Sequence, residues 1–157
     1  MTNHLNLSYH SQLDNLFCEW KAESLKYDEP REDYPDGKII FTEDGLIEKS
    51  EEFKIDIEKE WRKSDKRIMF LLKDQPANWC DDARLWLKKS PGNCQLESRF
   101  LRNIANIFWG LYYADSKHLC TSYEMQKSFE EIKACFNTKP FALVECKKQG
   151  GATSISN

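Results

Sequence analysis

The sequence predicts an α/β protein in which a parallel sheet is flanked by helices. Residues 67–72 and 141–146 each contain an apolar run without alternation, the pattern of strands that are buried on both faces of a parallel sheet. Amphipathic segments separate the two runs, so we expect a right-handed helical crossover between parallel strands. Polar loops follow both runs directly, and α/β proteins place their chemistry in such loops.

The chain of 157 residues is long enough for one domain and too short for two ordinary ones. A hydrophobic content of 40%, with 13% aromatic residues, excludes a disordered chain and predicts a sizeable core. Each apolar run suits neighbours on both sides, and the second lies close to residue 157. We therefore expect a single α/β domain over 1–157 that is the front part of a larger fold, either truncated or completed by a partner.

The chain before the first strand is expected to form a helix, a hairpin and a second helix. Residues 8–25 place large apolar side chains on one helical stripe after Ser8, which is a suitable N-cap. Residues 38–47 carry Glu-Asp-Gly between two apolar runs, which is typical of a hairpin turn. Residues 50–63 repeat apolar side chains at helical spacing after Ser50, a second candidate N-cap.

Three helices are expected between the two strands. The pair Asp81-Asp82 can cap a short helix over 84–87. Residues 95–113 have a wide apolar face and form the strongest helical pattern in the chain. A further helix over 122–136 has a serine at its first position as N-cap.

Composition restricts the compartment and the kinds of site. The first residues, MTNHLNLSYHSQLDN, lack the basic and apolar regions of a signal peptide, so we expect a cytoplasmic protein with reduced thiols. No cysteine pair has CxxC spacing and the chain has 3 His, so neither a metal site nor a cofactor is expected. Acidic residues predominate over 19–65 and basic residues over 66–157, which favours an anionic partner for the second half, or an ordinary mixed surface.

Both strand-end loops carry side chains suited to chemistry, and parallel strands bring such loops to the same sheet edge. An Asp there can act as a general base toward water, a Gln can bond a base edge, and Lys with Gly-Gly backbone amides can contact phosphate. Alternatively, the Asp forms an Asx-turn and the second loop is merely solvated. The residues concerned are Lys73, Asp74, Gln75 and Pro76 in the first loop, and Glu145, Lys147, Lys148, Gly150 and Gly151 in the second.

Other candidate residues carry weaker signals. Trp79 and Trp86 can stack on bases, although aromatic residues at helix starts are more often part of the core. Cys80 precedes an expected helix start, a position that favours a reactive thiol, but no histidine lies nearby in sequence. His118 is interpreted as a surface histidine. The motifs of P-loop enzymes, zincins, Rossmann enzymes and elbow-type hydrolases do not occur.

At 67–79 and 141–154 the sequence resembles the uracil-DNA glycosylase-like superfamily, and more closely its small, uncharacterised bacterial members. In that superfamily a buried strand runs into a motif of the Gly-Gln-Asp-Pro type at the base pocket. Here the first strand is followed by Lys73-Asp74-Gln75-Pro76, with the order of Asp and Gln reversed. The resemblance implies that Asp74 lies near the position of the water-activating acid and that Gln75 and Pro76 line the pocket.

The second strand of that family commonly ends in an Asn that reads the base, whereas this strand ends in Glu145. An ionised carboxylate does not donate hydrogen bonds, so uracil reading is expected to be altered or absent. The family fold has a four-stranded parallel sheet and a second catalytic motif, of the His-Pro-Ser type, after its last strand. The resemblance implies a DNA glycosylase-like hydrolase acting in DNA repair, with Glu145 at the base and Lys73, Lys147 and Lys148 at phosphates.

Two other functional hypotheses stay open. The first is a nucleic-acid-binding or interaction module that keeps the fold without the chemistry, favoured by Glu145 and by the absence of the second motif from residues 1–157. The second is structural: an exposed sheet edge pairs with another chain and gives a homo-oligomer.

Overall fold

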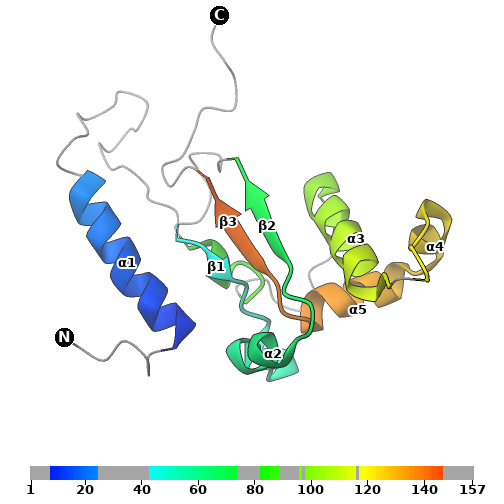
Figure 1. Cartoon of the computed structure of the whole chain (residues 1–157), viewed down its shortest axis with the longest axis horizontal. Helices are drawn as coiled ribbons and strands as arrows, with labels where there is room; N and C mark the ends of the chain where they lie inside the picture. Colours follow the sequence, from blue (N-terminus) through cyan, green and yellow to red (C-terminus); the bar gives the residue numbers. More distant parts are fainter. Residues whose placement is uncertain are drawn as a thin grey trace, which may run out of the picture.

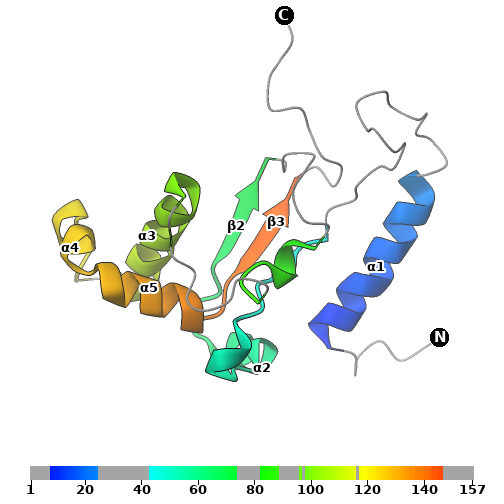
Figure 2. The same cartoon turned by 180° about the vertical axis from the view of Figure 1, so that it is seen from behind.

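The computed structural model describes residues 8–24, 43–73, 82–88, 96, 98–115 and 117–146. Helix α1 lies on one side of a small sheet, and α3 and α5 lie on the other (Figures 1 and 2), so the expected α/β class is confirmed. The elements are α1 (Tyr9–Ser24), β1 (Gly45–Leu46), η2 (Glu51–Phe53), α2 (Ile57–Lys63), β2 (Met69–Leu72), η3 (Ala83–Leu85), α3 (Arg99–Tyr113), α4 (Ser122–Lys127), α5 (Phe129–Thr138) and β3 (Ala142–Glu145).

The sheet has three strands in the order β1-β3-β2, and its directions are mixed. Strand β2 runs parallel to β3, with Met69 opposite Ala142 and Leu72 opposite Glu145, as the two apolar runs predicted. Strand β1 runs antiparallel to β3, with Gly45 opposite Leu143. The prediction of a parallel sheet is therefore correct for β2 and β3 and wrong for β1.

The expected Asp-Gly turn of a hairpin over 38–47 is also wrong, because Gly45 lies within β1 and pairs with β3. Residues 38–42 lie outside the described residues. A glycine is needed at this position for two local reasons. Its φ of +136° is a conformation that other residues rarely adopt, and a Cβ would lie 2.6 Å from Cδ1 of Leu13 on α1. Gly45 thus allows α1 to approach the sheet closely.

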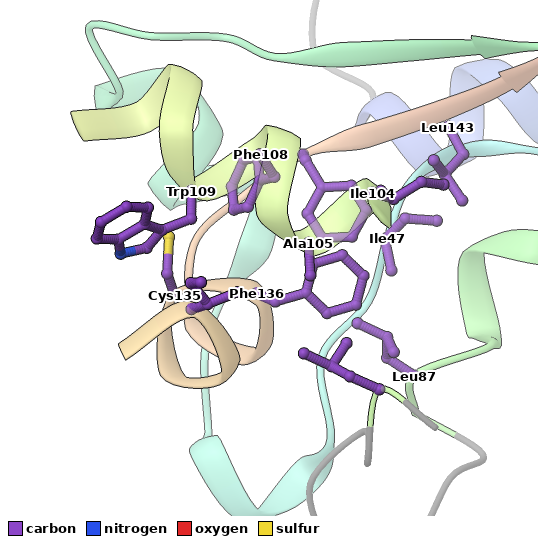
Figure 3. Packing of buried hydrophobic residues seen from close by; sticks show 12 residues of the cluster. Ile47, Leu87, Ile104, Ala105, Phe108, Trp109, Cys135, Phe136 and Leu143 are labelled. Carbon is purple, nitrogen blue, oxygen red and sulfur yellow. The ribbon is translucent and has the colours of Figure 1, made fainter. Parts of the chain in front are cut away.

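The main core lies between the sheet and the helices α3 and α5 (Figure 3). The rings of Phe136 and Phe141 stack with centroids 4.8 Å apart, and the Phe108 ring lies 5.0 Å from that of Phe141. All three side chains are fully buried. The Lys49 ammonium group donates to the carbonyl oxygen of Phe136 at 2.9 Å and lies 4.0 Å from the Phe141 ring centroid, so this buried cation is both hydrogen-bonded and packed on an aromatic face.

Helix α3 provides the largest apolar face, as its sequence predicted. The helix begins at Arg99, because the Ser98 hydroxyl accepts the backbone N–H of Leu101 at 3.1 Å and acts as N-cap. The expected start at residue 95 is wrong: Leu96 precedes the helix with a φ of 50° and is fully buried. Leu96 therefore joins the core from outside the helix.

Two other predicted helices are interrupted. The segment 50–63 forms η2 and α2, because Lys54 takes a left-handed conformation and the Asp56 side chain caps the new helix by accepting from Lys59 N–H. The segment 122–136 forms α4 and α5. Its N-cap is Thr121 rather than the serine at 122, since Thr121 and Glu124 form a reciprocal capping box.

Strand β2 is covered on one face only. Phe70 and Leu72 pack against the core on the side of α3, whereas Met69 and Leu71 are 60% and 66% exposed. The prediction that this strand is buried on both faces is wrong, because α1 packs against β1 and leaves the same face of β2 open. No helix in the described part of the chain is long and apolar enough to cross a membrane.

Candidate functional site

The carboxyl ends of β2 and β3 meet at one edge of the sheet, as the parallel pairing requires. Leu72 lies opposite Glu145, and the ladder extends one residue beyond β3, since Cys146 N–H donates to the Leu72 carbonyl at 2.8 Å. Lys73 follows β2 and is exposed. The structure therefore brings Lys73 and Glu145, two residues predicted for the site, to the edge where open α/β sheets bind their ligands.

Glu145 is the last residue of β3 and is 3% exposed. Because side chains alternate along a strand, Glu145 shares the face of Leu143, toward the core, while Ala142 and Val144 line a groove on the α1 side. A buried carboxyl group at the end of a central strand is uncommon in a core and points to a chemical or structural role for its oxygens.

Asp44 is a second buried carboxylate at this edge. It is 3% exposed, and its Oδ2 accepts the backbone N–H of Glu145 at 2.6 Å. Asp44 precedes β1, so its side chain provides an acceptor for β3 where the short ladder between β1 and β3 stops. Sequence reasoning missed Asp44 because Asp before Gly was interpreted as part of a turn.

Arg84 anchors the segments around the same end of the sheet. Its guanidinium group is buried and donates to Asp82 through two nitrogens at 2.9 Å, to Glu43 at 2.9 Å and to Asp14 at 2.7 Å. Burial opposes the positive charge, but the hydrogen bonds to Asp82 and Asp14 outweigh it and raise the pKa of Arg84 above its ordinary value. This network joins α1, the residue before Asp44, and η3, and Arg84 therefore remains charged at every physiological pH.

The predicted cap at the start of η3 is confirmed for Asp82, whose Oδ1 accepts the backbone N–H of Arg84 at 2.9 Å. The helix itself is a single 3₁₀ turn rather than the expected helix over 84–87. Trp86 is half-buried and packs against the core cluster, in agreement with the core interpretation. His118 is exposed, and its Nε2 lies 3.2 Å from the Glu124 carboxylate on the surface.

Most of the predicted site lies outside the described residues. This holds for Asp74, Gln75 and Pro76 after β2, and for Lys147, Lys148, Gly150 and Gly151 after β3, as well as for Trp79 and Cys80. Their roles stay predictions. Within the described ranges, no group of three His, Cys, Asp or Glu side chains could hold a metal ion.

A polar cavity of about 650 Å³ lies away from this edge, between the start of α1 and residues 48–58. Its charges are of both signs, and several of them are paired. Lys88 donates to Glu48 at 2.8 Å, and the Nε2 of His10 lies 3.9 Å from the other oxygen of Glu48. Such a surface selects no particular ligand charge, so the strand-end edge is the stronger candidate.

The chain was compared with protein families, curated proteins and solved structures. No family model, no curated protein and no solved structure matches it. The candidate site therefore rests on the geometry of the sheet and on the residues that the sequence places at its edge.

Proposed function

We propose that the carboxyl edge of β2 and β3 is a reaction site, and that the protein hydrolyses the N-glycosidic bond of a damaged base in DNA. The observation that supports this proposal is the buried Glu145 at the end of the central strand, beside the end of β2. The sequence resemblance to uracil-DNA glycosylase-like proteins falls on these same two strand ends. An enzyme that flips a base out of the duplex reads that base through hydrogen bonds to its edge, and a carboxyl group at the strand end can accept such bonds.

The residues have distinct roles in the proposed reaction. Asp74 orients water and takes its proton as the water oxygen bonds to C1′ of the sugar, while the C1′–N bond breaks and its electron pair leaves with the base. Gln75, Pro76 and Glu145 contact the base. Lys73, Lys147, Lys148 and the backbone of Gly150 and Gly151 contact phosphate.

Glu145 makes the proposed substrate different from uracil. An ionised carboxylate accepts hydrogen bonds, so it suits the exocyclic amino group of an adenine, cytosine or guanine lesion better than a carbonyl oxygen. Burial strengthens this preference, because a buried carboxylate without a donor on the bound base is unfavourable.

Duplexes that contain uracil or amino-bearing damaged bases test the proposal when abasic product is measured after alkaline cleavage. We expect product with an amino-bearing lesion, and a loss of about 100-fold in rate for Asp74→Ala, in line with loss of a general base. Glu145→Gln should change the order of preference among bases, whereas Glu130→Gln, which alters an exposed carboxylate on α5, should not. Product at the level of the Asp74→Ala protein for every base rejects the proposal.

A second candidate function is a binding module without catalysis. Its support is the nearly complete burial of Glu145 and the bond from its backbone to Asp44, which together suit a structural role. Such a module binds undamaged DNA and yields no abasic product. Its affinity should fall steeply with salt, and a Lys147→Ala/Lys148→Ala protein should show a shallower salt dependence.

A further inference from the structure

Strand β2 has a neighbour on one side only among the described strands. The carbonyls of Ile68 and Leu72 accept from Ala142 and Cys146 of the β3 segment. In a parallel ladder the alternate residues direct both backbone groups away from that neighbour. The N–H and C=O groups of Met69 and Leu71 therefore point outward, and their side chains are 60% and 66% exposed.

Helix α3 presents an apolar flank beside this edge. Ile107 and Leu111 lie one turn apart on α3 and are each 52% exposed. They lie on the opposite side of the helix from Trp109, whose ring lies beside Cys135 of α5 (Figure 3). Lys66, just before β2, donates to the carbonyls of Leu111 at 3.2 Å and Tyr112 at 2.7 Å. This contact places the last turn of α3 next to the segment that precedes β2.

Cationic side chains outnumber carboxylates around the edge, although Asp65 precedes Lys66 and Asp115 lies near the charge of Lys66. All charged side chains within 66–73 and 99–113 are cationic: Lys66, Arg67, Lys73, Arg99 and Arg102. The edge thus combines outward backbone groups, exposed apolar side chains on β2 and on α3, and a predominance of positive charge.

We propose that the edge of β2 that no described strand pairs with binds an extended segment of a partner protein, with alternating apolar residues between acidic ends. A strand is the occupant that satisfies the outward backbone groups, and its side chains would alternate between the α3 flank and the face of Met69 and Leu71. A second copy of β2 fits less well. Antiparallel pairing of Met69 with Leu71 places Arg67 opposite Lys73, and like charges that lie directly opposite are unfavourable. The proposal does not depend on the reaction at the carboxyl edge.

Fluorescence anisotropy with a labelled peptide of about nine residues, Val alternating with Thr between Glu pairs, tests this proposal. We expect saturable binding that weakens by about ten-fold when the central Val amides are N-methylated, because one edge of the peptide then loses its donors. Replacing the Glu pairs with Lys should weaken binding to a similar degree. No binding, or equal binding by the N-methylated or lysine-ended peptide, overturns the proposal.

Protein variants locate the binding surface. Leu71→Asp and Ile107→Asp should each weaken peptide binding by about ten-fold, because both add negative charge beside an acidic peptide. Leu119→Asp is the matched control, since Leu119 is 76% exposed in the connection between α3 and α4. Circular dichroism establishes that each variant is folded. Displacement of the peptide by single-stranded DNA would contradict the proposal. Self-association of the protein that light scattering detects, and that Leu71→Asp abolishes, would also contradict it.

Discussion

The two faces of β2 differ although their residues have similar hydrophobicity. On one face Phe70 and Leu72 pack against the core under α3, and on the other Met69 and Leu71 are mostly exposed. The strand pattern alone does not distinguish these faces, because all four residues are apolar. Whether a face of β2 is buried depends on where the flanking helices lie. The positions of these helices depend in turn on contacts far from the strand.

The position of α1 explains the open face. Asp14 and Phe17 of α1 contact Arg84, and Leu13 fits over Gly45, so the helix is held above β1 at the far side of the sheet. A groove of about 690 Å³ remains between α1 and the sheet. We therefore expect the core face to supply most of the stability, whereas Met69 and Leu71 on the other face are mostly exposed to solvent.

Truncating one side chain in the core and one on the open face of β2 tests whether the two regions differ in their contribution to stability. Phe141→Ala should lower the free energy of unfolding by about 3–5 kcal/mol, because it removes a fully buried ring that contacts three other rings and Lys49. Met69→Ala should cost less than about 1 kcal/mol, since the side chain is mostly in water. Urea unfolding measures both, and equal losses would show that the open face is covered in solution.

The anchoring of α1 is tested by Arg84→Met. This change leaves Asp14, Glu43 and Asp82 around a neutral side chain and should cost about 2–4 kcal/mol. Hydrogen exchange should increase in α1 more than in α3. Lys63→Met, which breaks an exposed pair with Glu60, is the control and should cost about 0.5 kcal/mol or less. Unchanged exchange in α1 would contradict the anchoring role.

A smaller effect is expected at the junction of β2 and α3. Lys66 donates to carbonyls of the last turn of α3, so Lys66→Met should cost about 1 kcal/mol. Lys73→Met, an exposed change at the other end of β2, should be nearly neutral. Thermal unfolding of the two variants provides the comparison, and a larger loss for Lys73→Met would contradict this assignment.

The smallest effect at neutral pH concerns Cys135 in the core. Burial raises the pKa of this thiol from 9.0 to about 12. Between these values the unfolded chain loses the proton while the folded chain keeps it. The stability that the protonated Cys135 thiol contributes to the folded state is therefore fully present below pH 9. It is lost as the pH rises toward 12. The Cys135→Ala protein should therefore lose less stability between pH 8 and pH 11 than the unchanged protein. Thermal unfolding at the two pH values measures both losses, and equal losses would contradict burial of the thiol.

Local signals predicted much of the fold. Ser8 accepts the backbone N–H of Ser11 and caps α1, and the apolar face of α3 packs as its spacing indicated. The capping box of Thr121 and Glu124 has the sequence pattern Thr-x-x-Glu, which favours Thr121 over the neighbouring serine as N-cap. The pairing of β1 with β3 was not predictable, since an Asp-Gly pair suits both a turn and a close helix contact.

The candidate site was predictable in part. Strand-end placement indicated Glu145 and Lys73 because parallel strands bring their ends together. It did not indicate Asp44 or the carboxylates around Arg84, because these are brought to the same end by tertiary packing rather than by a local pattern.

The order of the strands along the chain has a consequence during synthesis. Strand β3 lies between its two neighbours, but it is made about 70 residues after β2, so the sheet forms only when this late strand arrives. Until then the segment Met69–Leu72 is apolar, uncharged and prone to aggregate with other nascent chains. Arg67 and Lys73 flank this segment, and we expect their positive charges to oppose its aggregation before β3 has been made.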